Sequence, residues 1–127
     1  MNKKALVIDD DAEYRASVKD LLAANGYTVV TAEDGRVGYE EAVAQKPDVI
    51  LLDVMMEDCS AGLDTVKKLR DGAETANIPV MLITGIHKGN FLLSSYAPDE
   101  KFPNVKGVYE KPVKPEELVE NLTKVAA

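Results

Sequence analysis

The stretch that decides the fold is Val49-Ile50-Leu51-Leu52-Asp53, in which four apolar residues run into one carboxylate. A short, continuous apolar run that follows Pro47-Asp48 is typical of a strand buried on both faces. Asp53 then stands where this strand leaves the core. In open parallel α/β sheets, ligands bind just outside the carboxyl ends of the strands. We therefore expect Asp53 to face a crevice.

The rest of the chain alternates between strand-like and helix-like segments. The expected strands cover residues 5–8, 27–32, 49–53, 78–83 and 105–110. The expected helices cover residues 12–25, the segment from about 35 to just before Pro47, a segment that resumes near Gly62, and the last turns from Pro115. Between residues 86 and 104 the pattern is less regular, and only 91–96 could form a short helix there. This alternation predicts a five-stranded parallel sheet with helices on both faces.

Composition limits the class of protein. The chain has 127 residues, 46% of them apolar, which suits one domain with one core, over residues 1–127. The net charge of −7 argues against binding to nucleic acid or to an anionic membrane. Cys59 is the one cysteine, so no internal disulfide forms, and the apolar run after Met1 is too short for a signal peptide or membrane span. We predict a cytoplasmic protein.

Polar residues follow four of the expected strands. They are Asp9-Asp10-Asp11, Asp53, Thr84 and Lys111. Parallel strands end at one edge of a sheet, so these side chains should lie together. Neighbouring carboxylates repel one another unless a cation lies between them, and oxygen ligands favour Mg²⁺ or Mn²⁺. A zinc site is nearly excluded, because the chain has one His and one Cys.

A hard metal ion beside one hydroxyl and one ammonium suits a phosphoryl group. The metal and Lys111 would neutralise the phosphoryl oxygens, and Thr84 would donate a hydrogen bond. Asp53 stands alone at the central strand, whereas Asp9 and Asp10 supply charge for the metal. Asp53 is therefore the expected nucleophile, since a carboxylate can attack phosphorus to form an acyl phosphate.

At these residues the chain resembles the receiver domain of two-component response regulators, the family that includes the chemotaxis regulator. The resemblance covers essentially the whole chain. It rests on an ordered set of motifs: Leu6-Val7-Ile8-Asp9-Asp10-Asp11, Ile50-Leu51-Leu52-Asp53-Val54-Met55-Met56, Gly62, Ile83-Thr84-Gly85 and Lys111-Pro112. It implies a flavodoxin-like, doubly wound α/β fold with strand order 2-1-3-4-5.

The resemblance also implies roles for the site residues. Asp53 would receive a phosphoryl group from a histidine kinase or phosphotransfer protein. Asp10, Asp53 and the backbone carbonyl of Met55 would hold Mg²⁺, with Asp9 helping through water. The domain would then signal to a protein target that the sequence does not identify. It would not be an enzyme beyond its own phosphoryl transfer and autodephosphorylation.

Thr84 and Lys111 would contact the phosphoryl oxygens, but the chain departs from the family pattern around them. The aromatic switch residue usually lies three residues before the lysine, where this chain has Val108, followed by Tyr109. The segment between Thr84 and Lys111 is also longer than usual. The coupling of Thr84 to an aromatic side chain and the output surface are therefore open.

The loop after Asp53 departs from the pattern as well. Glu57 replaces a proline that is usual four residues after the phosphorylated aspartate, and Gly62 comes one residue later than is common. We expect Glu57 and Asp58 to be exposed loop acids rather than metal ligands.

Three simpler or competing interpretations stay open. Asp11 is better explained as a helix N-cap than as a metal ligand. The chain could be a binding module that keeps the receiver fold without phosphorylation. It could also be a haloacid-dehalogenase-type phosphohydrolase, whose nucleophile motif is half matched by Asp9-Asp10-Asp11, although Glu13 stands where that motif needs Thr or Val.

Overall fold

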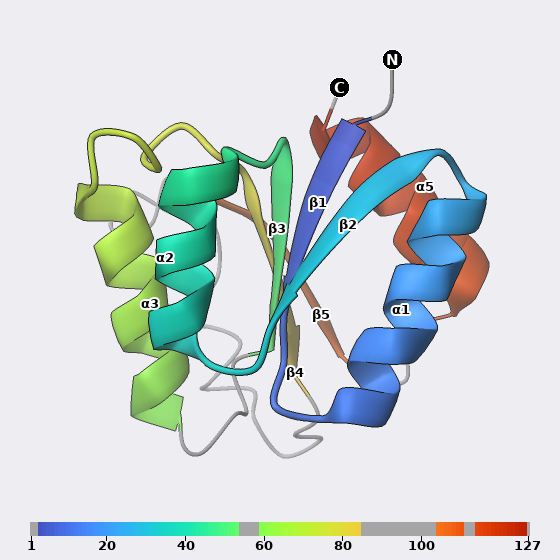
Figure 1. Ribbon diagram of the computed structural model, residues 1–127, viewed down its shortest axis with the longest axis horizontal. Coiled ribbons are helices and arrows are strands. Elements are labelled where there is room, and N and C mark those ends of the chain that lie inside the picture. The colour runs from blue at the N-terminus through green and yellow to red at the C-terminus, as the bar shows by residue number, and fades with distance from the viewer. Residues whose placement is uncertain (1–2, 54–58, 85–103, 111–113, 127) are drawn as a thin grey trace.

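A computed structural model of the chain describes residues 3–53, 59–84, 104–110 and 114–126. The strands are β1 (Lys3–Ile8), β2 (Tyr27–Ala32), β3 (Val49–Asp53), β4 (Val80–Thr84) and β5 (Val105–Glu110). The helices are α1 (Ala12–Ala24), α2 (Gly35–Gln45), α3 (Cys59–Asp71) and α5 (Pro115–Ala126). The expected alternation of strands and helices is therefore confirmed (Figure 1).

The strands form one parallel sheet in the order β2-β1-β3-β4-β5. Helices α1 and α5 cover one face, and α2 and α3 cover the other (Figure 1). The doubly wound α/β fold with strand order 2-1-3-4-5 is therefore confirmed. After β1 the chain turns to one side to form β2, and it then crosses back to form β3 on the other side of β1. This change of direction opens a crevice between the carboxyl ends of β1 and β3.

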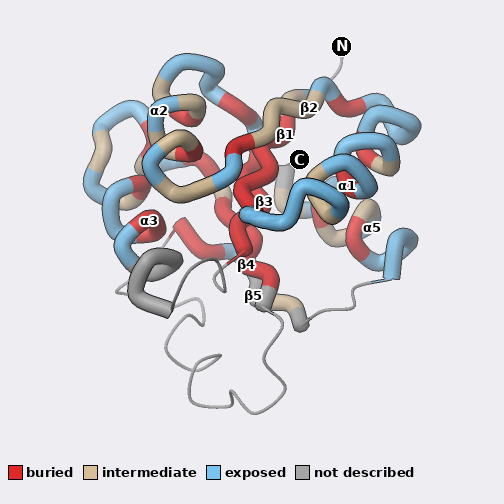
Figure 2. The backbone as a smooth tube through the Cα atoms, turned by 60° about the horizontal axis from the view of Figure 1, so that its bottom comes forward, coloured by how far each residue is buried: buried red, intermediate tan, exposed pale blue. Residues whose placement is uncertain are grey.

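The sheet separates two hydrophobic cores, because successive residues of a strand point to opposite faces. Ile50 and Leu52 pack on the α2–α3 side, together with Ala42, Val66 and Leu69. Val49 and Leu51 pack on the α1–α5 side, and the helix residues buried with them are Val18, Leu22, Leu118 and Leu122. The red course of the central strands shows that they are buried, whereas the edge strand β2 is largely half-buried (Figure 2).

Local sequence signals define several helix ends. Asp34 caps α2, since its side chain accepts a hydrogen bond from the backbone N–H of Val37 at 2.9 Å. Asn25 ends α1 and Gly26 follows with a φ of 91°, a conformation that suits glycine. Pro115 begins α5, where its missing N–H costs nothing. The start of α5 at Pro115 and the end of α1 near residue 25 agree with the sequence prediction.

Three starts differ from the prediction, and one is that of β1, which begins at Lys3 rather than at residue 5. Helix α3 begins at Cys59, three residues before Gly62. Strand β4 begins at Val80 rather than at residue 78, since Pro79 has no N–H to give to the ladder. The short helix predicted at 91–96 lies outside the described residues.

Gly38 lies where α2 packs tightly against Ile8 of the sheet. A Cβ atom built on Gly38 would lie 2.8 Å from the Ile8 Cγ1 atom and closer still to Ile8 Cδ1. We expect Gly38→Ala to lower the free energy of unfolding by about 1 kcal/mol, because overpacking outweighs the gain in helix propensity. Urea unfolding followed by circular dichroism measures the change.

The control is the same substitution in an Ile8→Ala background, which removes the side chain that the new methyl group would meet. There Gly38→Ala should be neutral or stabilising, so the two substitutions should not be additive. A Gly38→Ala variant that is more stable than the parent would contradict this packing.

Candidate functional site

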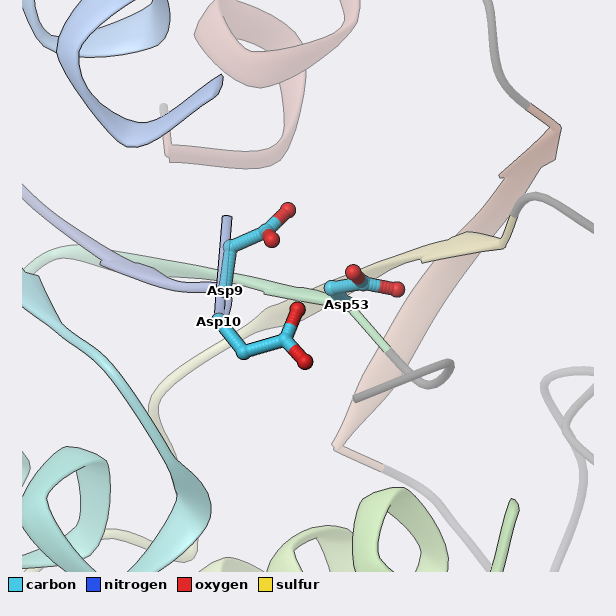
Figure 3. A group of neighbouring side chains, drawn as sticks. All are labelled: Asp9, Asp10 and Asp53. Atoms are coloured by element: carbon cyan, nitrogen blue, oxygen red, sulfur yellow. The ribbon is translucent and has the colours of Figure 1, made fainter. Parts of the chain in front are cut away.

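Three acidic side chains meet at the crevice between β1 and β3. Ile8 and Leu52 are paired across these strands, so Asp9 directly after β1 and Asp53 at the end of β3 lie side by side. Asp10 follows in the turn that leads to α1. Figure 3 shows the three carboxylates gathered at these strand ends. The sheet register thus brings together acids that are more than forty residues apart in the sequence.

The three carboxylates are close enough to share one ion. One ligand oxygen from each of Asp9, Asp10 and Asp53 lies within 4.8 Å of the others. Asp9 and Asp53 are almost fully buried, at 1% and 5% exposure, whereas Asp10 is exposed. The cluster therefore has a buried base and one side open to solvent.

Hydrogen bonds fix the turn that carries two of these acids. The Asp9 N–H donates to the carbonyl of Ala32 in β2 at 3.1 Å, and Asp9 Oδ1 accepts from the N–H of Asp11 at 2.9 Å. The Asp11 side chain caps α1 by accepting from the N–H groups of Glu13 and Tyr14. The predicted cap role of Asp11 is confirmed.

This donor set fits a hard divalent cation. All three groups offer carboxylate oxygens, the ligands that Mg²⁺ and Mn²⁺ prefer. Oxygens on opposite sides of one such ion stand about 4–5 Å apart, a separation comparable to that in the cluster. Without a cation, the carboxylates repel one another. The arrangement can therefore hold a metal ion at the open side of the cluster and present an Asp53 oxygen beside it.

The other predicted site residues are placed less fully. Thr84 ends β4 on the neighbouring strand, one residue beyond the Ile83 that pairs with Asp53, so its backbone lies at the same edge of the sheet. Met55 and Lys111 lie outside the described residues, as does the loop acid Glu57. The predicted roles of these residues stay predictions.

The suggested switch region is described in part. Val108 and Tyr109 both lie in β5, and Tyr109 is half-buried against the α1–α5 core. The segment 85–103, which includes most of the unusually long connection, lies outside the described residues. Coupling between Thr84 and an aromatic side chain therefore stays open.

One residue beside the cluster had no role in the sequence analysis. Arg15 in α1 donates from Nη1 to the backbone carbonyl of Asp9 at 2.6 Å. The sequence carries one signal for it, a cationic residue near the N-terminus of a helix, where the helix dipole favours anions. Such a placement suggests nearby negative charge.

Comparisons with known proteins identify the family of the chain. The family model for the response regulator receiver domain matches residues 5–123. The chain is 34% identical over 108 residues to the alkaline phosphatase synthesis transcriptional regulatory protein PhoP of Bacillus subtilis, across 85% of this chain and 39% of that protein. It is 33% identical over 138 residues to the phosphate regulon transcriptional regulatory protein PhoB of Klebsiella pneumoniae, across 94% of this chain and 58% of that protein. The chain thus spans less than two thirds of either regulator.

Solved structures show the same architecture. The chemotaxis response regulator CheY4 of Vibrio cholerae superposes with a TM-score of 0.81 at 28% identity, over 98% of this chain and 99% of that one. A response regulator protein from Burkholderia multivorans gives a TM-score of 0.74 at 31% identity, over 100% and 97%. Among the described residues, no helix is long and apolar enough to cross a membrane. With its acidic cluster at the carboxyl edge of a 2-1-3-4-5 sheet, the chain belongs to the receiver domain family of two-component response regulators.

Proposed function

We propose that Asp53 accepts a phosphoryl group from the phosphohistidine of a histidine kinase or phosphotransfer protein, with Mg²⁺ or Mn²⁺ bound at the acidic cluster. The observation that carries this proposal is the meeting of Asp53 with Asp9 and Asp10 within 4.8 Å at the end of a fully buried strand. Membership of the receiver family supports it. The phosphorylated domain then changes its binding to a downstream protein.

The chemistry follows from the groups at the edge of the sheet. An Asp53 carboxylate oxygen attacks phosphorus in line with the bond to the leaving nitrogen, which departs with its electron pair as an acyl phosphate forms. When bound, the cation neutralises phosphoryl and carboxylate oxygens and so lets two anions approach. We assign Thr84 and Lys111 to hydrogen-bond and charge contacts with the phosphoryl oxygens, and the Met55 carbonyl to the cation.

The proposed partners are proteins. Receiver domains are signalling domains rather than classical enzymes, so the donor is another protein and self-catalysed transfer and autodephosphorylation are the reactions of the chain itself. The net charge of −7 disfavours direct binding of this domain to nucleic acid. We propose a single receiver domain over residues 1–127, acting in the cytoplasm.

One prediction of this function concerns Asp53 as the phosphoryl acceptor. A small phosphodonor such as phosphoramidate should phosphorylate the wild-type chain once when Mg²⁺ is present, and Asp53→Asn should abolish the modification, because an amide is not a nucleophile towards phosphorus. Intact-mass spectrometry measures the product, and peptide mapping after borohydride trapping locates it.

Asp64→Asn is the matched control, since Asp64 is an exposed acid in α3 and the change in charge is the same. It should leave phosphorylation unchanged. Persistent labelling of the Asp53→Asn variant would reject the assignment. Many turnovers of a generic phosphate ester would instead favour the phosphohydrolase interpretation, and an absence of any labelling would favour the phosphorylation-independent module.

A further prediction concerns the repulsion among the three carboxylates when no cation is bound. Asp10→Asn should raise the free energy of unfolding in EDTA by about 0.5–2 kcal/mol, because it removes one of three mutually repelling carboxylates. Added Mg²⁺ should stabilise the wild-type chain, since it binds the folded state, and should stabilise Asp10→Asn much less. Urea unfolding with EDTA or with Mg²⁺ gives all four values.

Asp20→Asn supplies the comparison, since Asp20 is an exposed acid further along α1. It should change stability little and should retain the stabilisation by Mg²⁺. Equal stabilisation by Mg²⁺ in Asp10→Asn and in the wild type would argue against the cluster as the cation site.

A further inference from the structure

Arg15 makes an unusual contact for a residue of a surface helix. It is the fourth residue of α1 and is half-buried, and its guanidinium reaches back over the start of the helix rather than out to solvent. Nη1 donates to the carbonyl oxygen of Asp9, six residues earlier, at 2.6 Å. The donor is charged, and hydrogen bonds from charged donors are stronger than those between neutral groups.

The positive charge of Arg15 lies near the N-terminus of α1, the end at which the helix dipole disfavours a cation. The N-terminus of α1 carries partial positive charge, which repels a guanidinium and attracts carboxylates. Arg15 is stable there because acids surround the same end of the helix, with Asp9 and Asp10 before it and Asp11 as its cap. The guanidinium therefore lies in the negative field of the cluster.

The contact acts on the peptide group that leads into Asp10. The carbonyl of Asp9 and the N–H of Asp10 belong to one planar peptide group. A donor that holds this carbonyl therefore fixes the orientation of the peptide plane, and with it the direction in which the backbone enters Asp10. Asp10 is the exposed member of the cluster and has the weakest packing restraint on its carboxylate.

The neighbouring contacts complete this restraint. Asp9 is held by its N–H to Ala32, by its Oδ1 to the Asp11 N–H, and by its carbonyl to Arg15. The Arg15 N–H also donates to the Asp11 carbonyl at 3.0 Å, as the first bond of the helix. The backbone on both sides of Asp10 is thus fixed, and of these contacts the Arg15 guanidinium is the one that acts on the peptide leading into Asp10.

We propose that Arg15 is a positioning residue of the cation site, which holds the peptide between Asp9 and Asp10 so that the Asp10 carboxylate faces Asp53. This inference rests on the proposed function, because it gives the cluster a cation to bind. Groups that orient the ligands of a metal typically change its affinity about 10–100-fold when removed. The positive charge alone would have the opposite effect, since a cation beside the site repels a second cation. The two roles therefore predict opposite signs.

The test compares the affinity of Arg15→Gln and wild-type chains for Mg²⁺ or Mn²⁺ alone, by isothermal titration calorimetry. We expect Arg15→Gln to raise the Kd about tenfold or more. The Kd of Arg15→Lys should fall between those of the wild type and Arg15→Gln, since an ammonium keeps the charge and can donate to the carbonyl but lacks the planar guanidinium. An unchanged or lower Kd in Arg15→Gln would overturn the positioning role.

Arg36→Gln is the matched control. Arg36 is an exposed residue at the start of α2, paired with Glu40 at 3.0 Å, and its loss changes the net charge by the same amount. It should leave the Kd unchanged or slightly lower it. A rise in Kd equal to that of Arg15→Gln would mean that the effect does not depend on the contact with the Asp9 carbonyl, and would overturn the proposal.

A second measurement needs no cation. Amide NMR relaxation of the metal-free chain should show lower order at Asp10 and Asp11 in Arg15→Gln, with order parameters falling from about 0.85 towards 0.6, while Val7 in β1 stays rigid. Unchanged order at Asp10 would overturn the positioning role. A wild-type chain that binds neither cation would instead overturn the proposed function, so the two failures are distinguishable.

Discussion

The burial of β3 on both faces is the constraint on which the site depends. Every residue of this strand is buried, with alternate side chains contributing to the two cores. A shift of the strand by one residue towards the core would carry the Asp53 carboxylate into an apolar interior, and the effective penalty for burying a charge is several kcal/mol. The hydrophobic effect, which acts on the apolar residues of the strand, therefore fixes the position of Asp53 at the edge of the sheet.

The same constraint creates a cost at that edge. The register that places Asp53 beside Asp9 brings like charges together, and the turn into α1 adds Asp10. Folding must offset this repulsion with the burial of the strands on either side. Sites of this kind are often the places where a chain gives up stability for function. The mutually repelling acids at one edge of an otherwise well-packed sheet are an example of stability given up for function.

The sequence predicted the elements that depend on local chemistry. Apolar runs identified the buried strands, and Asp11 and Pro115 identified helix starts, because each acts on backbone groups within a few residues. The strand order came from the family resemblance, since the residues themselves favoured a parallel sheet without ordering its strands. The meeting of Asp9, Asp10 and Asp53 followed from the common direction of parallel strands.

What the sequence did not predict depends on details of three-dimensional geometry. The start of α3 at Cys59 was predicted too late, although Asp58 directly before it is a residue type favoured at helix N-caps. Arg15 had no predicted role because its partner is a backbone carbonyl, which every residue carries, and only the shape of the turn brings the two together. Contacts from a side chain to a distant backbone group leave little trace in a residue pattern.

The separation of the two cores by the sheet has a consequence for how the chain can vary. Side chains of the α2–α3 core and of the α1–α5 core come from alternate residues of the same strands, and the backbone of the sheet lies between them. Changes of volume in one core are therefore compensated by neighbours in that core and are largely screened from the other. The helices on one face of the sheet can therefore change in sequence while those on the other face stay the same. Both faces share the acidic edge of the sheet.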